Sequence, residues 1–177
     1  KEKCQYNIIL RERSPRKSYA VKREALERAF KTGEPSMAIV RRFEEDIKNN
    51  NITEYFDDNN MNREGCSGDI YYLTKYEYDA VECISSIIYF GNRDDNGKFI
   101  KGRPAGKAFA LAADERYKSR QFPHLHDIIY EEFVTNKLYL RNEPTRFQHF
   151  VSTLLRKREG SVWMVANSIS RVCPYFH

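Results

Sequence analysis

The chain has 177 residues, of which 41% are hydrophobic and 14% aromatic, and this supplies the core of one compact α/β domain. It contains no apolar run of 18 residues, and its first residues hold only a short apolar stretch before charge resumes. We therefore expect neither a membrane span nor a signal peptide. The net charge of +5 permits contact with a polyanion without requiring it. The four cysteines lack close metal-ligand spacing, and we expect reduced thiols in a cytoplasmic protein.

The first third of the chain predicts two strands and a long helix. Residues 5–10, QYNIIL, predict a short buried strand, and residues 18–31 predict a helix because apolar residues recur every three or four positions. Residues 36–42, SMAIVRR, predict a second strand, and residues 43–50 predict a short helix. Residues 49–69 are rich in Asn, Asp and Gly, so we expect a mobile loop there.

The composition and turn signals in the middle of the chain indicate an antiparallel sheet. Residues 69–113 are rich in β-branched and aromatic side chains, and the Asn-Gly pair in RDDNGKF indicates a hairpin turn. We predict an antiparallel meander that ends at residues 106–112, followed by a polar, basic connection over residues 113–122. Residues 126–133, HDIIYEEF, predict a strand that ends on two acids.

The last part of the chain completes an alternation of strands and helices. A helix with one apolar face is expected from about Arg146, and residues 161–168, SVWMVANS, predict a buried strand. Outside the meander this order favours a mostly parallel sheet flanked by helices. Ligands of such sheets bind beyond the carboxyl ends of the strands. Because polar clusters at residues 11–18, 131–132 and 167–168 each follow a predicted strand, we expect them to converge there.

The loop RERSPRKS has the layout of a phosphate-binding loop between a strand and a helix. Lys17 would contact the terminal phosphates, the Ser18 hydroxyl would bind Mg²⁺, and the following helix would present its positive dipole end. In the motif G-x-x-x-x-G-K-S/T, however, Arg11 and Arg16 occupy the glycine positions. The residues alone therefore leave two interpretations open, a phosphate-binding site or a basic strand-to-helix turn.

Glu131 and Glu132 stand together directly after an apolar strand. Hydrolysis of a phosphoanhydride needs one carboxylate in the Mg²⁺ shell and another that polarises the attacking water. Adjacent acids at a strand end can point to different sides and take these two roles. A pair of exposed surface acids is the alternative. Asp is the commoner residue for the first role, and Glu131 is longer by one methylene.

Two further groups of polar residues have both a functional and a structural interpretation. Arg156 and Arg158 end the predicted helix, where they either interact with its dipole or act as an arginine finger on a neighbouring subunit's γ-phosphate. Asn167 and Ser168 end the last strand, where they either sense the γ-phosphate and orient water or simply form a turn.

Taken in order over most of the chain, these segments resemble the DNA-packaging ATPases of small, short-tailed, protein-primed phages, which are relatives of the large-terminase motors. The matching segments are RKSYAVK after the strand NIIL, AIVRRF, IIYEEF, LLRKRE and VANSISRVCPYF. The resemblance implies an ASCE-type P-loop NTPase fold, with a mostly parallel central sheet flanked by helices and an antiparallel meander inserted. It also implies a homomeric ring, typically a pentamer, mounted on a capsid portal.

The resemblance also implies a role for individual residues within one subunit. Ser18 and Glu131 would hold Mg²⁺, and Glu132 would be the catalytic glutamate that activates water. The ATP-binding residues would be Arg13, Ser14, Pro15, Arg16, Lys17, Ser18, Arg41 and Asn167.

Other residues would act between subunits. Arg156 matches the arginine finger that acts in trans, with Arg158 as the other candidate. Lys118 matches a basic residue that acts beside it near the neighbour's nucleotide. Arg41 and Arg42 match a pair of arginines at a strand end, near the nucleotide or the subunit interface.

The function implied by the resemblance is that of a Mg²⁺-dependent ATP hydrolase that translocates double-stranded DNA into a procapsid. Such a motor works in the host cytoplasm, transiently at the portal vertex, without a membrane partner. Longer members continue into a nuclease-like domain that contacts DNA, so we expect residues 1–177 to be the ATPase domain alone.

Two other functions remain open. The glycine-free loop favours a basic DNA-binding module with a degenerate, non-hydrolysing phosphate loop, but such a module has no need of the acid pair. A small-molecule phosphotransferase is the other alternative, and the long antiparallel meander argues against it.

Overall fold

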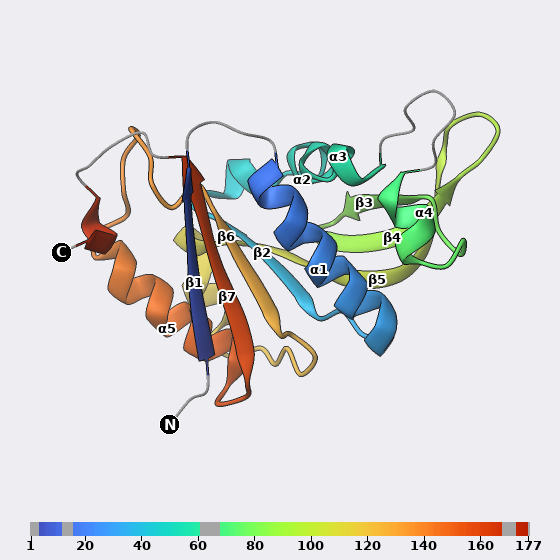
Figure 1. Ribbon diagram of the computed structural model, residues 1–177. Helices are drawn as coiled ribbons and strands as arrows, with labels where there is room; N and C mark the ends of the chain where they lie inside the picture. The colour runs from blue at the N-terminus through green and yellow to red at the C-terminus, as the bar shows by residue number, and fades with distance from the viewer. Residues whose placement is uncertain (1–3, 12–15, 61–67, 168–172, 177) are drawn as a thin grey trace.

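A seven-stranded sheet forms the centre of the molecule in the computed structural model, which describes residues 4–11, 16–60, 68–167 and 173–176 (Figure 1). In chain order the strands are β1 (Cys4–Arg11), β2 (Met37–Arg41), β3 (Ala80–Ile84), β4 (Ile87–Arg93), β5 (Phe99–Ala110), β6 (Asp127–Glu131) and β7 (Gly160–Asn167). Their spatial order is β1-β7-β6-β2-β5-β4-β3. The five strands from β1 to β5 in this order are parallel, and β4 and β3 continue antiparallel.

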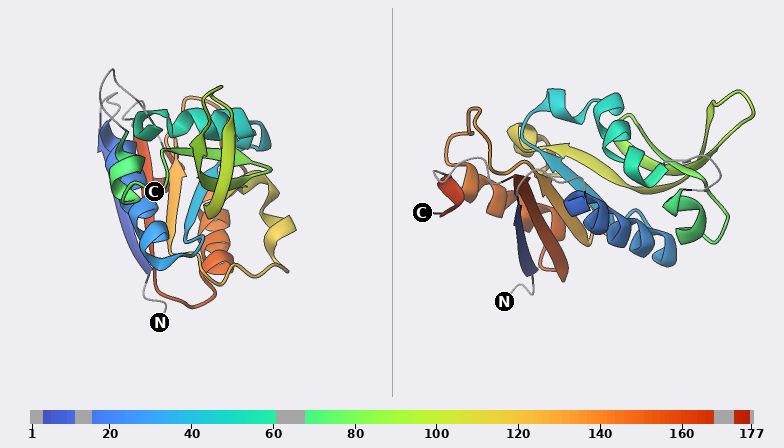
Figure 2. Two further views of the ribbon diagram at one scale, coloured as in Figure 1. Left: turned by 90° about the vertical axis from the view of Figure 1, so that its right-hand side faces the viewer. Right: turned by 45° about the horizontal axis from the view of Figure 1, so that its top comes forward.

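Helices cover both faces of the sheet. They are α1 (Arg16–Thr32), α2 (Asn49–Tyr55), α3 (Asp57–Asn60), α4 (Asp69–Leu73) and α5 (Glu143–Leu155), with the 3₁₀ helices η1 (Glu44–Ile47), η2 (Leu111–Tyr117) and η3 (Pro174–Phe176). Helix α1 lies on one face and α5 on the other, as the left view of Figure 2 shows. No helix in the described part of the chain has both the length and the apolar character that a membrane crossing requires.

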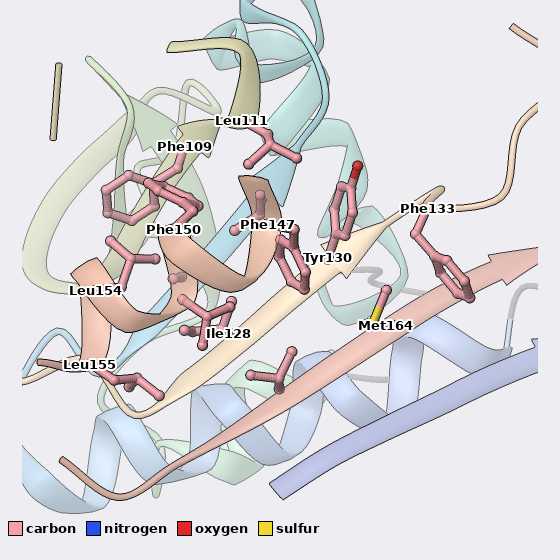
Figure 3. Close-up of a cluster of buried hydrophobic side chains, with 14 of the residues drawn as sticks. Phe109, Leu111, Ile128, Tyr130, Phe133, Phe147, Phe150, Leu154, Leu155 and Met164 are labelled. Atoms are coloured by element: carbon pink, nitrogen blue, oxygen red, sulfur yellow. The ribbon is translucent and has the colours of Figure 1, made fainter. Parts of the chain in front are cut away.

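Two hydrophobic cores result, one on each face, because successive side chains of a buried strand point to opposite sides. Ile128 and Tyr130 of β6 belong to the core under α5, whereas Ile129 belongs to the core under α1. Figure 3 shows the α5 core. The helix residues predicted to form the apolar face are all buried, and these are Phe147, Phe150, Val151, Leu154 and Leu155.

The predicted α/β class with a mostly parallel sheet is confirmed, as is the hairpin at the Asn-Gly pair. The turn between β4 and β5 contains Gly97 at φ +76°, a left-handed conformation that glycine adopts without steric cost. Cys83 and Cys173 are buried free thiols, as expected. The side chain of Cys4 and residue Cys66 lie outside the described part.

Two predictions for the middle of the chain were wrong. Residues 49–60, predicted as a loop, form α2 and α3, because Ile52 and Phe56 lie on one helical face and are both buried in the core. The Asn60 amide continues this packing by bonding both backbone groups of Val81, at 2.8 Å each. The start of the predicted meander is helix α4 instead. Residues 61–67, part of the same predicted loop, lie outside the described part.

Candidate active site

Three neighbouring parallel strands bring the predicted polar clusters together at their carboxyl ends. Arg11 at the end of β1 pairs with Asn167 at the end of β7, and Glu131 at the end of β6 pairs with Val165 of β7. The predicted convergence of the strand ends is therefore confirmed at the level of the backbone. The first turn of α1 lies at the same edge, where Figure 1 shows it beside the tips of β1 and β7.

The phosphate-loop prediction falls largely on residues that the structure does not describe. Arg13, Ser14 and Pro15 lie outside the described residues, as do the side chains of Arg16 and Lys17. The backbone does show that α1 begins at Arg16, with no acidic residue in its first turn. The positive end of the helix dipole is thus not neutralised by its own side chains.

Glu131 is the centre of the site. It is only 7% exposed, and its carboxylate forms hydrogen bonds with the hydroxyls of Ser18 and Tyr55. Burial raises the pKa of Glu131 above its ordinary value, while these two hydrogen bonds and the charges of Arg41 and Lys22 oppose the shift. The structure therefore brings together the two residues that the sequence predicted as metal ligands.

Glu132 has the opposite environment. Its side chain is 60% exposed, and its Oε2 lies 3.6 Å from Nη2 of Arg41. Its backbone has φ +56°, which is unusual for a residue with a side chain, and its N–H donates to the Val165 carbonyl at 2.8 Å. The two adjacent acids thus have different environments, one buried beside a hydroxyl and one exposed to solvent, so the alternative of two exposed surface acids is wrong for Glu131.

Arg42 holds this unusual backbone in place. It is 5% exposed and donates to the carbonyls of Glu132 at 3.2 Å and Phe133 at 3.1 Å. Its guanidinium also forms a two-bond ion pair with the buried carboxylate of Glu143, at 2.8 and 2.9 Å. Arg42 lies near the site, as predicted, but it is too deeply buried to line a subunit interface by itself.

Tyr55 and Lys22 belong to the site although the sequence did not indicate them. Burial, followed by the Glu131 carboxylate, raises the pKa of Tyr55 well above its ordinary value, so its hydroxyl remains a hydrogen-bond donor. Lys22 is 2% exposed, and its ammonium donates to the Tyr55 carbonyl and lies 4.3 Å from the centre of the Tyr55 ring. One signal was available in the sequence: Lys22 lies four residues after Ser18, on the same face of α1.

Lys118 and Arg156 lie together toward the amino ends of the parallel strands, away from Glu131. Arg156, at the end of α5, donates through Nη2 to the carbonyls of Lys118 at 3.1 Å and Arg120 at 2.9 Å. Arg158 donates to the Phe122 carbonyl at 2.5 Å, just before β6 begins. Because β6 then runs for about 13 Å to Glu131, the structure does not bring these cations to the Glu131 of the same chain.

Glu131 and Ser18, at the carboxyl ends of the parallel strands, fit a magnesium ion. A carboxylate and a hydroxyl are hard oxygen donors of the kind that Mg²⁺ prefers, and those of Glu131 and Ser18 are in contact. Across the described ranges no group of three or more His, Cys, Asp or Glu side chains could hold a metal by itself. An ion here would therefore take its other ligands from phosphate oxygens and water, as Mg²⁺ commonly does.

Comparison with known proteins relates the chain to phage DNA packaging. The profile of a family described as Podovirus DNA encapsidation protein (Gp16) matches residues 91–177. A DNA packaging protein of Bacillus phage B103 is 29% identical over 178 residues, which cover 96% of this chain and 46% of that protein. The DNA packaging protein of Bacillus phage phi29 is 27% identical over 174 residues, covering 96% and 45%. The chain thus spans about half the length of these relatives.

Solved structures show the same fold. The N-terminal domain of the DNA packaging ATPase from bacteriophage phi29 matches with a TM-score of 0.68 and 24% identity, over 97% of this chain and 77% of that one. A chain of the phi29 viral genome packaging motor assembly matches with a TM-score of 0.66 and 22% identity, over 97% and 46%. The mixed α/β fold with its mostly parallel sheet is therefore shared with the packaging ATPase domain.

Proposed function

We propose that this chain is the ATP-hydrolysing part of a phage DNA-packaging motor, with a P-loop NTPase fold of the ASCE type. The observation that carries the proposal is the contact between the Ser18 hydroxyl and the buried Glu131 carboxylate, directly beside the exposed Glu132. Phosphoanhydride hydrolysis needs these three groups: a hydroxyl and a carboxylate at the metal, and a second carboxylate at the water. The relationship to phage DNA packaging proteins supports the same function.

Within one subunit, binding and proton transfer fall to different residues. The loop before α1, Lys17 and the first turn of α1 would bind the phosphates, with Ser18 and Glu131 as ligands of Mg²⁺. Mg²⁺ held by Ser18 and Glu131 would supply positive charge that neutralises the phosphates. Glu132 would accept a proton from the attacking water at a carboxylate oxygen. Arg41, 3.6 Å away, restrains the Glu132 carboxylate until nucleotide arrives.

Catalysis would be completed by the neighbouring subunit. Arg156 and Lys118 lie at the edge of the sheet opposite Glu131, so they serve a nucleotide only if a second copy presents them. A homomeric ring of any size gives every site one such neighbour, and we propose a pentamer because the family resemblance implies one. Within the described part of the chain, both hydrogen bonds of the Arg156 guanidinium use Nη2, which leaves its other donors for a γ-phosphate. Arginine fingers contribute about 10³–10⁵ in rate.

The remaining parts of the motor follow from this arrangement. Double-stranded DNA would pass through the ring and be held by phosphate contacts without sequence readout. The ring would assemble in the host cytoplasm and work transiently at the portal of the procapsid. Asn167, at the end of β7 beside the site, would pass the state of the nucleotide to the segment that follows.

A second candidate function is a basic DNA-binding module that does not hydrolyse ATP, and the glycine-free loop favours it. Calorimetric binding of a non-hydrolysable Mg-ATP analogue separates the two. We expect saturable binding that is lost in Lys17→Ala and kept in Lys31→Ala, an exposed lysine at the far end of the same helix. Absence of binding to the assembled wild-type protein up to millimolar nucleotide, with DNA binding unaffected by Glu132→Gln, would favour the binding module.

A further inference from the structure

Helix α2 brings a side chain from a separate part of the chain into the site. Tyr55 is the last residue of α2, and its hydroxyl donates to Oε1 of Glu131, 76 residues away in the sequence. The next residue, Phe56, is fully buried in the core and fixes the end of the helix. The ring of Tyr55 packs against that of Phe56 edge to face, with their centres 5.4 Å apart. The position of the Tyr55 hydroxyl is thus set by core packing.

Lys22, a residue of helix α1, binds Tyr55. Its buried ammonium bonds the Tyr55 carbonyl and lies over the Tyr55 ring, and the acids Asp57 and Asp58 of α3 attract it further. A buried ammonium is costly unless it is paired, so these contacts hold α1 and the 55–58 segment together. The Ser18 hydroxyl, one turn before Lys22, lies within hydrogen-bond reach of both Tyr55 and Glu131. The four side chains therefore form one connected network.

This network restricts the carboxylate of Glu131, which is a longer side chain than the Asp usually found as a metal-binding acid at this position. Glu131 has one methylene and one rotatable bond more than the Asp that is commoner in this role, so its carboxylate has more positions to choose from. Two hydroxyl donors, one from α1 and one from α2, restrict that choice. Groups that orient a metal ligand in this way commonly change metal affinity about 10–100-fold when they are removed.

We propose that Tyr55 is a positioning residue for Glu131: its hydroxyl holds the carboxylate beside Ser18 in the orientation that binds Mg-nucleotide, and Lys22 holds Tyr55. The role rests on the proposed nucleotide site and deepens it. It makes residues 49–60 a working part of that site, although neither ATP nor Mg²⁺ is expected to touch them.

The test uses Tyr55→Phe, which removes one oxygen and keeps the ring that packs on Phe56 and Lys22. Tyr72→Phe, an exposed tyrosine on α4, is the matched control, and thermal unfolding confirms that both variants fold. Binding of a non-hydrolysable ATP analogue to the assembled protein is measured by calorimetry at a series of Mg²⁺ concentrations and in EDTA. We expect Tyr55→Phe to need about tenfold more Mg²⁺, with unchanged affinity in EDTA. Tyr72→Phe should match the wild type in both conditions.

A second background shows whether Tyr55 acts through Glu131. In Glu131→Gln, which has lost the carboxylate, Tyr55→Phe should change the Mg²⁺ requirement by less than about twofold, because the two changes remove the same interaction. Equal losses with Mg²⁺ and in EDTA, or a full loss that persists in Glu131→Gln, would show a merely structural role and overturn the inference. A wild type that binds no nucleotide would instead overturn the proposed function, and with it this role.

Discussion

Neutralising Glu143 should cost this protein a large part of its stability. The Glu143 carboxylate is buried, and besides its two bonds from Arg42 it accepts hydrogen bonds from the hydroxyls of Tyr130 at 2.7 Å and Tyr175 at 3.0 Å and from the Leu140 N–H at 2.8 Å. Glu143→Gln keeps the shape of the side chain but leaves the Arg42 guanidinium buried without a counter-charge. Removing one partner of such a pair costs about 3–5 kcal/mol.

That loss is large because a domain of ordinary stability has only about 5–15 kcal/mol in total. Urea unfolding measures it as a lower midpoint at an unchanged slope. The control is Glu27→Gln, which breaks a surface pair with Lys31 and should cost less than about 0.5 kcal/mol. A loss below about 1 kcal/mol for Glu143→Gln would refute the view that Arg42 depends on this carboxylate.

The other predictions concern the site and the elements that support it. Mixing inactive Glu132→Gln subunits with inactive Arg156→Ala subunits should restore some phosphate release, because mixed rings contain interfaces with both groups intact. If the two variants stay inactive when mixed, this would contradict a role for Arg156 in trans. Because burial raises the pKa of Glu131, ionising it costs stability as the pH rises above 4.5 toward its folded value. Glu131→Gln should therefore unfold at higher urea than wild type at pH 7, and the gain should vanish below pH 4.5; a variant less stable at pH 7 would contradict the direction of the shift. Phe56→Ala should cost about 3–5 kcal/mol in urea unfolding, since this ring is fully buried under α2, and a loss near zero would show that α2 is not anchored there.

Local patterns were sufficient for the elements whose burial is periodic. The apolar stripe of α5 and the apolar runs of β2, β6 and β7 could be recognised without any tertiary information. The run of β1 also predicted a strand, but the prediction that it is buried was wrong, because β1 is the outermost strand of the sheet and its Tyr6, Ile8 and Leu10 are exposed. The alternation of these strands with helices predicted parallel strands, and parallel strands place their carboxyl ends at one edge. The meeting of Ser18 with Glu131 is a consequence of that topology.

Long-range contacts explain what the sequence did not reveal. The composition of residues 49–60 is dominated by Asn and Asp, so only their packing through Ile52 and Phe56 makes them helical. Tyr55 reaches Glu131 through that packing, and no local pattern records it.

Arg41 and Arg42 show how neighbours in sequence can differ in role. Because successive side chains point to opposite sides of a strand, Arg41 faces the exposed Glu132, whereas Arg42 enters the buried network around Glu143. The prediction treated the two arginines as a pair, and it did not distinguish these two environments. Glu131 and Glu132 differ in the same way: the sequence predicted that the two acids could take different roles, but it did not show which of them is buried.

Nucleotide binding and phosphate release, measured together in the assembled protein, show directly whether Glu132 acts on the attacking water. We expect Glu132→Gln to bind the Mg-ATP analogue as tightly as wild type but to release phosphate at least about a hundredfold more slowly, because only the proton acceptor for water is lost. Glu115→Gln, which changes an exposed acid paired with Lys118, should still bind the analogue normally. Phosphate release by Glu132→Gln at the wild-type rate would contradict the assignment of this edge of the sheet as an ATP-hydrolysing site.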